Sequence, residues 1–380
     1  ALRQAATLAP QDASAHAALG FALFNAGQFA PARQELTLAN RATPDDENLV
    51  RQLVYVNQRL SDGVQTRRYS RQAIDMIDNA AGTQPLSRAA ADTRFSLRRI
   101  HEDSARRWTF TFDGWIGTDS GSAPRNITSP TSGSDAQQKN SRSYGQFEGQ
   151  YKIGDNQLRE GDTLAAYGRL FAQGKYSDQN NHDIGNSNWP IYAPMAAVGL
   201  RWKPLHDQVF YLAAEEQVPL DHHRGEVDTL LRASASFFNS GRYSDEWHAN
   251  GSGWMAQNLY LDAGHYLKNN HEIYTADYRL SWHQKVHEGQ TLEPYSHIQS
   301  NAGLVSNSLS DYTKWDQYSS DLLGGVGMRY NLWLGQTHYD AWPHKISFGL
   351  EYQYVFTLSN LQTIGLEERD SVIFTLGGRW

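Results

Sequence analysis

The sequence predicts a tetratricopeptide-type helical array followed by an antiparallel transmembrane β-barrel of about 12 strands, with an upper limit of about 16. Three observations lead to this fold class. Apolar and small residues recur with a period of 34 in the first part of the chain, and apolar residues alternate with polar ones from residue 108 onward. The 380 residues also combine a polar mean hydropathy of −0.63 with 20 Tyr and 11 Trp. We therefore expect a helical domain at 1–107 and a barrel at 108–380.

The composition fits a barrel better than other classes of polar chain. A disordered chain is poor in aromatic residues, and a helical membrane protein needs runs of about 20 apolar residues, which this sequence lacks. Alternating lipid-facing and lumen-facing residues give a polar average, and Tyr and Trp gather at the two membrane interfaces of a barrel. The chain has no Cys, so neither disulfides nor thiolate metal sites are available.

Charge is distributed unevenly between the two predicted domains. Residues 1–107 hold 14 Arg, no Lys and 11 acidic residues, whereas 108–380 hold the other 20 basic and 30 acidic residues. Domains that bind nucleic acid carry basic patches, so the acidic barrel domain argues against nucleic acid as a partner.

One repeat with tetratricopeptide spacing predicts the helical array. Gly20 and Ala32 are the small residues that let two paired helices approach closely, Gly27 lies at the turn between them, and Pro44 ends the second helix. The pattern repeats after 34 residues in three pairs: Leu2 and Leu36, Ala5 and Ala39, Pro10 and Pro44. Residues 1–10 are therefore interpreted as the last helix of a preceding repeat, and we expect the natural N-terminus to lie upstream. A plain helical hairpin is the alternative.

Three further helical segments follow this repeat. Residues 47–59 keep the apolar pattern without the small residues, which is typical of a degenerate terminal repeat that caps an array. Amphipathic segments at 64–77 and 86–100 complete the helical domain. The first of them carries an Arg-rich exposed face. We expect this face to bind a partner in the periplasm through Arg67, Arg68 and Arg71.

Strands with one apolar face are predicted over the rest of the chain. The clearest strand alternates Phe348 and Leu350 with Ser347 and Gly349. A soluble β-sandwich would also alternate, but strands of about 10 residues with aromatic ends match a bilayer-spanning strand better than a soluble strand of about five or six. The predicted strands lie near 108–118, 143–153, 163–173, 195–203, 208–217, 228–237, 253–266, 272–284, 291–300, 319–331, 344–356 and 371–380.

The connections between these strands are of two kinds. Residues 154–160, 204–207 and 286–290 form short links, whereas 120–140, 176–194 and 301–315 form long links rich in Gly, Ser, Asn and Asp. Short periplasmic turns and long outer loops are typical of outer-membrane barrels, and an even number of strands places both barrel ends at the periplasm. The weakly patterned segments 189–194 and 238–247 could hide further strands.

The last predicted strand ends the chain on an aromatic residue. Phe374, Leu376 and Trp380 share one face of this strand. Such a strand resembles the segment by which outer-membrane barrels are presented to the barrel assembly machinery, and we expect these three residues to act in assembly. The alternative is a core strand that happens to end the chain.

The polar faces of the strands supply the candidates for a transport path. In an open channel these groups would contact a hydrated solute, whereas the alternative for each is an ion pair that holds the shape of the barrel. The candidates are Arg232, Asp277, Arg279, Arg329, Glu351, Gln353 and Arg379.

Catalytic motifs are absent from the sequence. It contains no Gly-rich phosphate loop, no Gly-x-Ser-x-Gly elbow and no His-Glu-x-x-His pair. Asp221, His222 and His223 form the only dense His group, and adjacent side chains diverge, so we expect no metal site. His283 lacks an identifiable Ser partner and is interpreted as a membrane-interface residue. We expect neither an enzyme nor a cofactor.

Three barrel segments carry a resemblance to a known family: Tyr144–Tyr151, Asp162–Tyr167 and Gly199–Leu205. They resemble the bacteriophage adsorption protein A C-terminal family, over most of 108–380. A tetratricopeptide array before a barrel is also similar to the wider group of exopolysaccharide export porins. The resemblance implies a bacterial outer-membrane location, passage of an exopolysaccharide, and use as a receptor by a phage tail protein. It also implies that the helical array binds an inner-membrane synthase or a periplasmic partner. It supplies no catalytic residue.

Three functions remain open after this reading. The first is an export channel for exopolysaccharide, the second is a plugged barrel that acts as a surface receptor or assembly platform, and the third, least favoured, is a barrel enzyme. Outer-membrane lipid and the barrel assembly machinery are expected partners in each case. Single-channel conductance separates the first two functions, because a plugged barrel passes little current.

Overall fold

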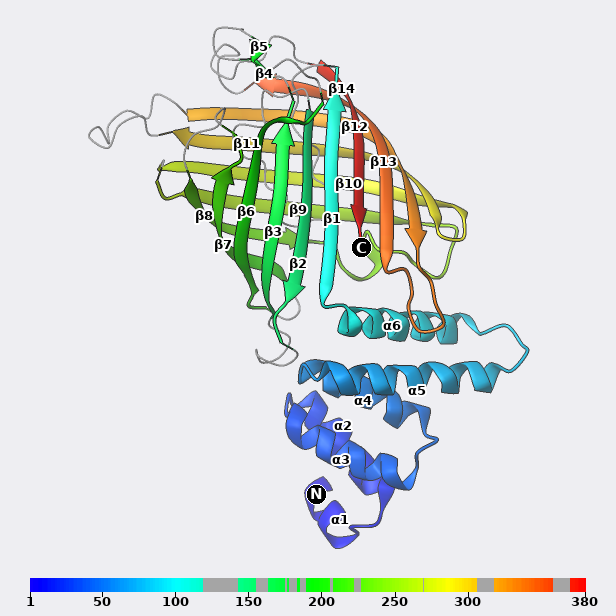
Figure 1. The fold of residues 1–380 in the computed structure, drawn as a ribbon. Helices are drawn as coiled ribbons and strands as arrows, with labels where there is room; N and C mark the ends of the chain where they lie inside the picture. Colours follow the sequence, from blue (N-terminus) through cyan, green and yellow to red (C-terminus); the bar gives the residue numbers. More distant parts are fainter. Residues whose placement is uncertain are drawn as a thin grey trace. The chain divides into compact units, whose positions relative to one another are not determined.

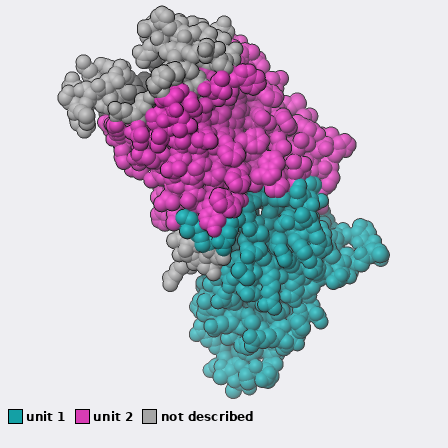
Figure 2. Space-filling view, in the orientation of Figure 1, with its two compact units in different colours: residues 1–107, 152–163, 335–343 teal, residues 108–151, 164–334, 344–380 magenta. Residues whose placement is uncertain are grey.

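The fold is known from a computed structural model of the 380-residue chain, drawn in Figure 1. It describes residues 1–118, 143–154, 163–174, 176–177, 183–184, 189–205, 208–221, 227–268, 270–305, 318–357 and 370–380. The chain divides into two compact units, which Figure 2 shows in different colours. Unit 1 comprises 1–107, 152–163 and 335–343, and unit 2 comprises 108–151, 164–334 and 344–380.

Unit 1 is built mainly from helices. They are α1 (Leu2–Leu8), α2 (Ala13–Asn25), α3 (Phe29–Ala42), α4 (Glu47–Arg59), α5 (Gly63–Ala81) and α6 (Arg88–Ala105). Asp12, Asp46, Asp62 and Ser87 precede four of these helices, and each accepts a hydrogen bond from a backbone N–H of the first turn. Such caps satisfy donors that a helix leaves free at its start, which explains where the helices begin. The predicted helices at 64–77 and 86–100 are confirmed as α5 and α6. Both end a few residues later than predicted, and α6 begins at Arg88.

Helices α2 and α3 pack as the close pair that the sequence predicts. A Cβ on Gly20 would lie 2.7 Å from Leu36 Cγ, so a larger residue at position 20 would push the helices apart. Gly27, in the turn between them, has a φ of +73°, which glycine adopts without strain. Ala32, Leu36 and Ala39 have no exposed surface and form the centre of the helical core. The assignment of this pair to a tetratricopeptide repeat stays a prediction.

The connection Gly335–Pro343 also belongs to unit 1, and we call it the helix-packed turn. Arg98 on α6 donates a hydrogen bond to the carbonyl of Thr337, and His101 Nδ1 lies 2.9 Å from Asp340 Oδ1. Tyr339 packs against the helical core and donates its hydroxyl to a carboxylate on α5. The turn is therefore held by side chains of two helices.

Unit 2 is a closed antiparallel barrel. Its strands are β1 (Trp108–Gly117), β2 (Ser143–Lys152), β3 (Thr163–Gln173), β6 (Tyr192–Lys203), β7 (Val209–Pro219), β8 (Asp228–Phe237), β9 (Gly253–Tyr266), β10 (His271–His287), β11 (Gln290–Val305), β12 (Tyr318–Leu334), β13 (His344–Thr357) and β14 (Asp370–Arg379). Each strand pairs with its sequence neighbours in the barrel, and β1 also pairs with β14, with Thr111 opposite Arg379 and Gly117 opposite Ile373. Closure of this kind leaves the barrel without a free edge.

All 12 predicted strands are confirmed. The two segments that could hide further strands contain no additional barrel strand. Residues 238–247 form no strand and include a 3-10 helix (Gly241–Tyr243), and residues 192–194 are the start of β6. Two short strands, β4 (Tyr176–Ser177) and β5 (Asp183–Ile184), pair only with each other outside the barrel. The predicted long loops at 120–140 and 301–315 fall largely outside the described residues. Within the described part of the chain, no helix is long and apolar enough to span a membrane.

Exposure alternates along the barrel strands. On β10, Tyr278, Leu280 and Trp282 are 41%, 40% and 47% exposed, whereas the interleaved Arg279 and His283 are 2% and 0% exposed. Because successive side chains of a strand point to opposite faces, the barrel has an apolar outer face and a polar inner face. The rim at which β1 begins and β14 ends is called the proximal rim. The up-and-down order places the connections 204–208, 238–252, 288–289 and 335–343 at this same rim.

Candidate functional site in the barrel interior

The predicted lumen candidates lie on the inner face of the barrel. Arg379 is partly exposed. The other six are at most 8% exposed: Arg232, Asp277, Arg279, Arg329, Glu351 and Gln353. Their use in transport stays a prediction, but the structure shows what they contact.

Charged residues on the inner face form direct pairs between strands, including one predicted candidate, Arg232. Arg232 lies 2.6 Å from Asp262, and Arg201 lies 3.0 Å from Glu148. Taking a charge out of water costs several kcal/mol, so each buried guanidinium needs a carboxylate beside it. These pairs fit the alternative raised from the sequence, in which polar lumen residues hold the shape of the barrel.

A larger group joins β10, β11, β12 and β13. His297 lies 3.0 Å from Asp277 Oδ1 and 2.7 Å from Glu351 Oε1, and Tyr295 donates its hydroxyl to the other oxygen of Glu351. The Arg329 guanidinium lies over the Tyr295 ring, 4.6 Å from its centroid. All five side chains are at most 5% exposed, so side chains fill the barrel interior at this level.

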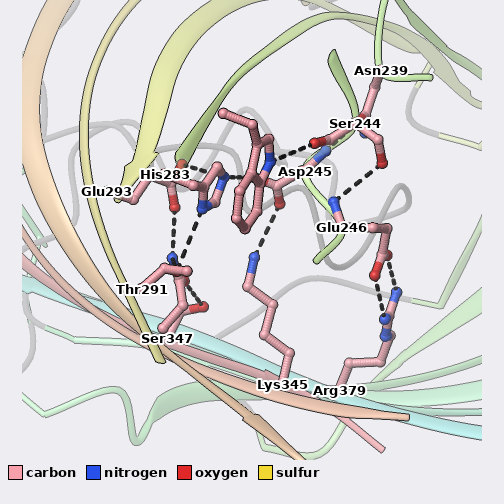
Figure 3. Close-up of polar contacts among 12 residues, drawn as sticks. Asn239, Ser244, Asp245, Glu246, His283, Thr291, Glu293, Lys345, Ser347 and Arg379 are labelled. Atoms are coloured by element: carbon pink, nitrogen blue, oxygen red, sulfur yellow. Dashed lines mark hydrogen bonds and ion pairs between the residues drawn. The ribbon is translucent and has the colours of Figure 1, made fainter. Parts of the chain in front are cut away.

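The chain between β8 and β9 folds into the barrel interior, and we call residues 238–252 the inner segment. Its course is held by its own side chains. Asn239 Oδ1 accepts a hydrogen bond from the backbone N–H of Asp245 at 2.9 Å, and Ser244 Oγ accepts one from the N–H of Glu246 at 3.1 Å. These local turns direct two acidic side chains toward the inner face of the barrel (Figure 3).

Asp245 is the central charge of this site (Figure 3). His283 Nε2 on β10 lies 2.9 Å from its Oδ1, and Lys345 Nζ on β13 lies 3.1 Å from its Oδ2. Glu293 on β11 has an oxygen 3.7 Å from the same His283 nitrogen. The four side chains are at most 6% exposed, so water does not screen these interactions.

Two further residues attach the inner segment to the barrel. Glu246 receives hydrogen bonds of 2.8 and 3.2 Å from the two terminal nitrogens of Arg379 on β14. Trp247 is 2% exposed, and its ring centroid lies 5.9 Å from that of Trp254 on β9 and 6.2 Å from that of Trp333 on β12. The inner segment therefore contacts inward side chains of β9, β10, β12, β13 and β14. From β11, Glu293 lies close to the same cluster.

The charges of this site fit a closed ion cluster better than a metal centre. Asp245, His283 and Glu293 offer three ligand atoms within 4.8 Å of one another. Lys345 already pairs with Asp245, and Arg329 interacts electrostatically with both carboxylates. Two carboxylates thus face two permanent cations, and a divalent ion would leave buried positive charge without compensation. The cluster is suited to holding the inner segment in place.

The interpretation of His283 as a membrane-interface residue is wrong. It lies at an inward position of β10, with no exposed surface, while its neighbour Trp282 faces outward. His283 Nδ1 is 3.5 Å from Thr291 Oγ1, which gives a Thr–His–Asp order with Asp245. All three members are buried, so a substrate cannot reach the hydroxyl in this arrangement.

The predicted partner-binding arginines have contacts inside unit 1. Arg67 donates a hydrogen bond to the carbonyl of Ser104, and Arg71 Nε donates one to His101 Nε2 at 2.9 Å. The Arg68 guanidinium lies 5.5 Å from the ring centroid of the tyrosine that follows it. Two of these residues thus join α5 to α6. Partner binding by the three residues stays a prediction.

The predicted assembly residues cover the seam where the barrel closes. Phe374, Leu376 and Trp380 face outward and are 47%, 37% and 40% exposed. Trp380 stacks on Phe112 of β1 with ring centroids 6.2 Å apart, and its backbone N–H donates to the carbonyl of Phe110 at 2.8 Å. Their role in assembly stays a prediction. His222 and His223, where no metal site is expected, lie outside the described residues.

The inner segment is the part of the site that sequence reasoning missed. Its weak alternation suggested a hidden strand. A usable signal was its position, because a long connection occurs at the rim where short turns prevail and carries Asp245, Glu246 and Trp247 in succession. Charged and aromatic residues at such a place need inward partners, and Lys345 and Arg379 on later strands supply them.

Comparison with known proteins relates the chain to one family. Residues 186–366 match the family described as "Bacteriophage N adsorption protein A C-term". A relative from Escherichia coli (strain K12), described as "Bacteriophage adsorption protein A", is 48% identical over 384 residues. The resemblance to this family that the sequence predicts is confirmed. The match covers 100% of this chain but 36% of that relative, so the chain spans little more than a third of the relative's length.

Several solved structures that match the chain at low sequence identity are outer-membrane proteins. LpxR from Salmonella typhimurium is 8% identical with a TM-score of 0.38, and the match covers 71% of this chain and 99% of that one. The COG4313 outer membrane channel from Pseudomonas putida F1 is 12% identical with a TM-score of 0.37, over 72% and 94% of the two chains. A bacterial polysaccharide outer membrane secretin is 9% identical with a TM-score of 0.31, over 72% and 98%.

Proposed function

We propose that this chain forms an outer-membrane barrel that its inner segment keeps closed, and that the barrel serves at the cell surface as an attachment receptor for a phage. The apolar outer face suits outer-membrane lipid, and an even number of strands brings both barrel ends to the proximal rim. On this proposal the proximal rim and the helical unit lie in the periplasm, and the connections of the opposite rim face outside. The 48% identity to a bacteriophage adsorption protein supports the receptor role.

The observation that carries the closed barrel is the burial of the inner segment's charged residues against strands from much of the barrel wall. Asp245 and Lys345 are 6% and 4% exposed, and Glu351 on the adjoining level is 1% exposed. Open, water-filled channels leave their lumen charges hydrated, whereas these charges are almost fully buried and pair with other side chains. A closed barrel needs no path for solutes in order to serve as a receptor.

Export of an exopolysaccharide is the second candidate function, with the inner segment as its gate. The inner segment is attached by ion pairs and ring contacts, not by strand pairing, so it can leave without opening the barrel wall. The polar residues on the inner face would then meet a hydrated glycan. The helical unit would bind the inner-membrane synthase or a periplasmic partner that delivers it.

The remaining roles follow from the same proposal. The outward residues of β14 would be read by the barrel assembly machinery, and a phage tail protein would bind the outer connections. No enzymatic reaction is proposed. His283, which lies between Thr291 and Asp245, is fully buried.

Conductance in planar bilayers tests the closed state. We expect the purified chain to pass little current, and a variant in which 239–251 is replaced by a short Gly-Ser linker to pass a large one. Full conductance of the unaltered chain would overturn the closed barrel. A substitution far from the barrel interior, Arg51→Ala, is the control, since Arg51 pairs with Glu47 within α4.

Phage adsorption tests the receptor role. A tag inserted within 120–140 should be accessible on intact cells and should reduce adsorption, whereas a tag at 204–207 should be inaccessible. A tag that is accessible at 204–207 and inaccessible within 120–140 would contradict the proposed orientation. Adsorption that survives tags in every outer connection would refute the receptor role and leave the closed barrel unaffected.

A further inference from the structure

One strand pair carries both the helix-packed turn and two of the contacts that hold the inner segment. Strand β12 ends at Leu334, the helix-packed turn follows, and β13 begins at His344. Trp333 and Lys345, which contact the inner segment, are each the second residue away from the turn. They also contact each other, with Lys345 Nζ 4.5 Å from the Trp333 ring centroid.

Side chains of α5 and α6 hold the helix-packed turn along its length. Besides the contacts of Arg98 and His101, Glu102 Oε2 accepts a hydrogen bond from the backbone N–H of Trp342 at 3.2 Å. Asp75 accepts the Tyr339 hydroxyl at 3.1 Å and lies 3.0 Å from a ring nitrogen of His338. These bonds come from two helices and engage both arms of the turn.

The contacts on the barrel side depend closely on where the turn lies. The Lys345 ammonium reaches a buried carboxylate at 3.1 Å, and a buried ion pair weakens steeply when it lengthens, because no water replaces the lost partner. A slip of one residue in the pairing of β12 with β13 would turn Lys345 to the lipid face. Bonds that fix the turn therefore also fix the two residues that contact the inner segment.

We propose that the helical unit controls the inner segment through this strand pair. A partner that binds α5 and α6 more tightly when the turn is released would shift Trp333 and Lys345, loosen the inner segment and open the barrel. The coupling rests on the proposed function, since it supplies the regulation of the same closed barrel. It requires two arrangements of the turn and a ligand that binds them unequally.

A single cysteine reports the position of the inner segment, because these 380 residues contain none. Ser244→Cys is nearly isosteric, and Ser244 is 8% exposed, so a maleimide reacts with it slowly while the segment is in place. Asp75→Ala and, separately, His101→Ala each remove part of the contacts that hold the turn against the helices. We expect each to raise the labelling rate about fivefold or more, and to raise conductance in bilayers, within the range of typical coupling between sites.

Two matched variants complete the experiment. Arg33→Ala breaks the 3.1 Å pair with Asp62 within the helical unit, away from the turn, and should leave the labelling rate unchanged. Lys345→Ala frees the inner segment directly and should raise the rate without any change in the helices. Heat-modifiable migration in gels confirms that every variant contains a folded barrel.

The outcomes separate the coupling from the closed barrel. Fast labelling in Lys345→Ala with unchanged labelling in Asp75→Ala and His101→Ala would overturn the coupling and keep the closed barrel. An equal rise in Arg33→Ala would also overturn it, because general loosening of the helices would then explain the effect. Fast labelling of Ser244→Cys in the otherwise unaltered chain would refute the closed barrel itself.

Discussion

The ammonium of Lys345 lies 3.1 Å from the carboxylate of Asp245, and this pair joins β13 to the inner segment inside the barrel. Both side chains are almost fully buried, at 4% and 6% exposed. A pair of this kind can cost as much in desolvation as it gains in attraction, so its value for stability is small. The pair instead fixes the position of the inner segment against β13, because either partner alone would be an uncompensated buried charge.

Removing one partner of this pair should be more harmful than removing both. We expect Lys345→Met to lower the free energy of unfolding by about 3–5 kcal/mol, and the double variant Lys345→Met with Asp245→Asn to regain much of that loss. Urea unfolding followed by Trp fluorescence measures both. Glu47→Gln, in the exposed pair with Arg51, should cost less than about 1 kcal/mol and serves as the control. Equal losses in the single and double variants would contradict the buried-pair account.

Two glycines on neighbouring strands should respond differently to the same substitution. A Cβ on Gly199 would lie 2.5 Å from the backbone oxygen of Ala214, whereas a Cβ on Gly168 would lie 3.7 Å from its nearest neighbour, the oxygen of Ala197. Gly199→Ala must therefore separate β6 from β7, at a cost of about 1–3 kcal/mol, while Gly168→Ala fits without movement. The folded fraction in heat-modifiability gels tests this. Similar behaviour of the two variants would argue against the close approach at Gly199.

Strand positions could be predicted because each barrel strand separates lipid from a polar interior. That separation imposes a period of two over about ten residues, which Ile346 to Phe356 display without interruption. The helical pair was predictable for a similar reason, since the contact of Gly20 with Leu36 excludes larger residues. In both cases one local requirement is written into the sequence.

The inner segment could not be predicted because its partners are distant in the chain. Asp245 is held by His283 and Lys345, and no local spacing connects these positions. The same limit applies to Arg67 and Arg71, whose charges suggested an exposed binding face but which contact Ser104 and His101 on α6. A sequence therefore shows that a charged residue needs a partner if it is buried, but it does not show which residue that partner is.

The seam between β14 and β1 should be sensitive to the outward aromatic residue that ends the chain. Trp380 stacks on Phe112, and a Cβ on Gly378 would lie 2.3 Å from the same Phe112 ring. We expect Trp380→Asp to reduce the amount of heat-modifiable barrel in the outer membrane, because it removes this contact and places a charge at the lipid face. Trp380→Phe keeps a ring on Phe112 and should assemble normally. Normal barrel levels for Trp380→Asp would refute the seam as a requirement for assembly.

Two histidines of the helical unit should give opposite dependences on pH. A hydrogen bond of 2.6 Å to Glu35 raises the pKa of His16, since the charged ring gains a carboxylate partner. Burial lowers the pKa of His101, and Arg71 acts in the same direction because it donates to His101 Nε2, which must then be unprotonated. The stabilising contribution of His16 is thus complete below the unfolded pKa of about 6.5 and is lost as pH rises through its higher folded pKa. That of His101 is complete above about 6.5 and is lost as pH falls toward its lower folded pKa.

Matched substitutions separate these two contributions. We expect His16→Gln to lower the thermal midpoint of the helical circular dichroism signal more at about pH 5.5 than at about pH 8.5, and His101→Gln to lower it more at the higher pH. The two variants share the same chemical change, so a general effect of pH on the barrel or on the solvent would move both in one direction. His16 and Glu35 are also partly accessible to water, and added salt should reduce the effect of His16→Gln at low pH. An effect of His101→Gln that grows on acidification would mean that His101 is protonated beside Asp340, and that Arg71 does not donate to its ring.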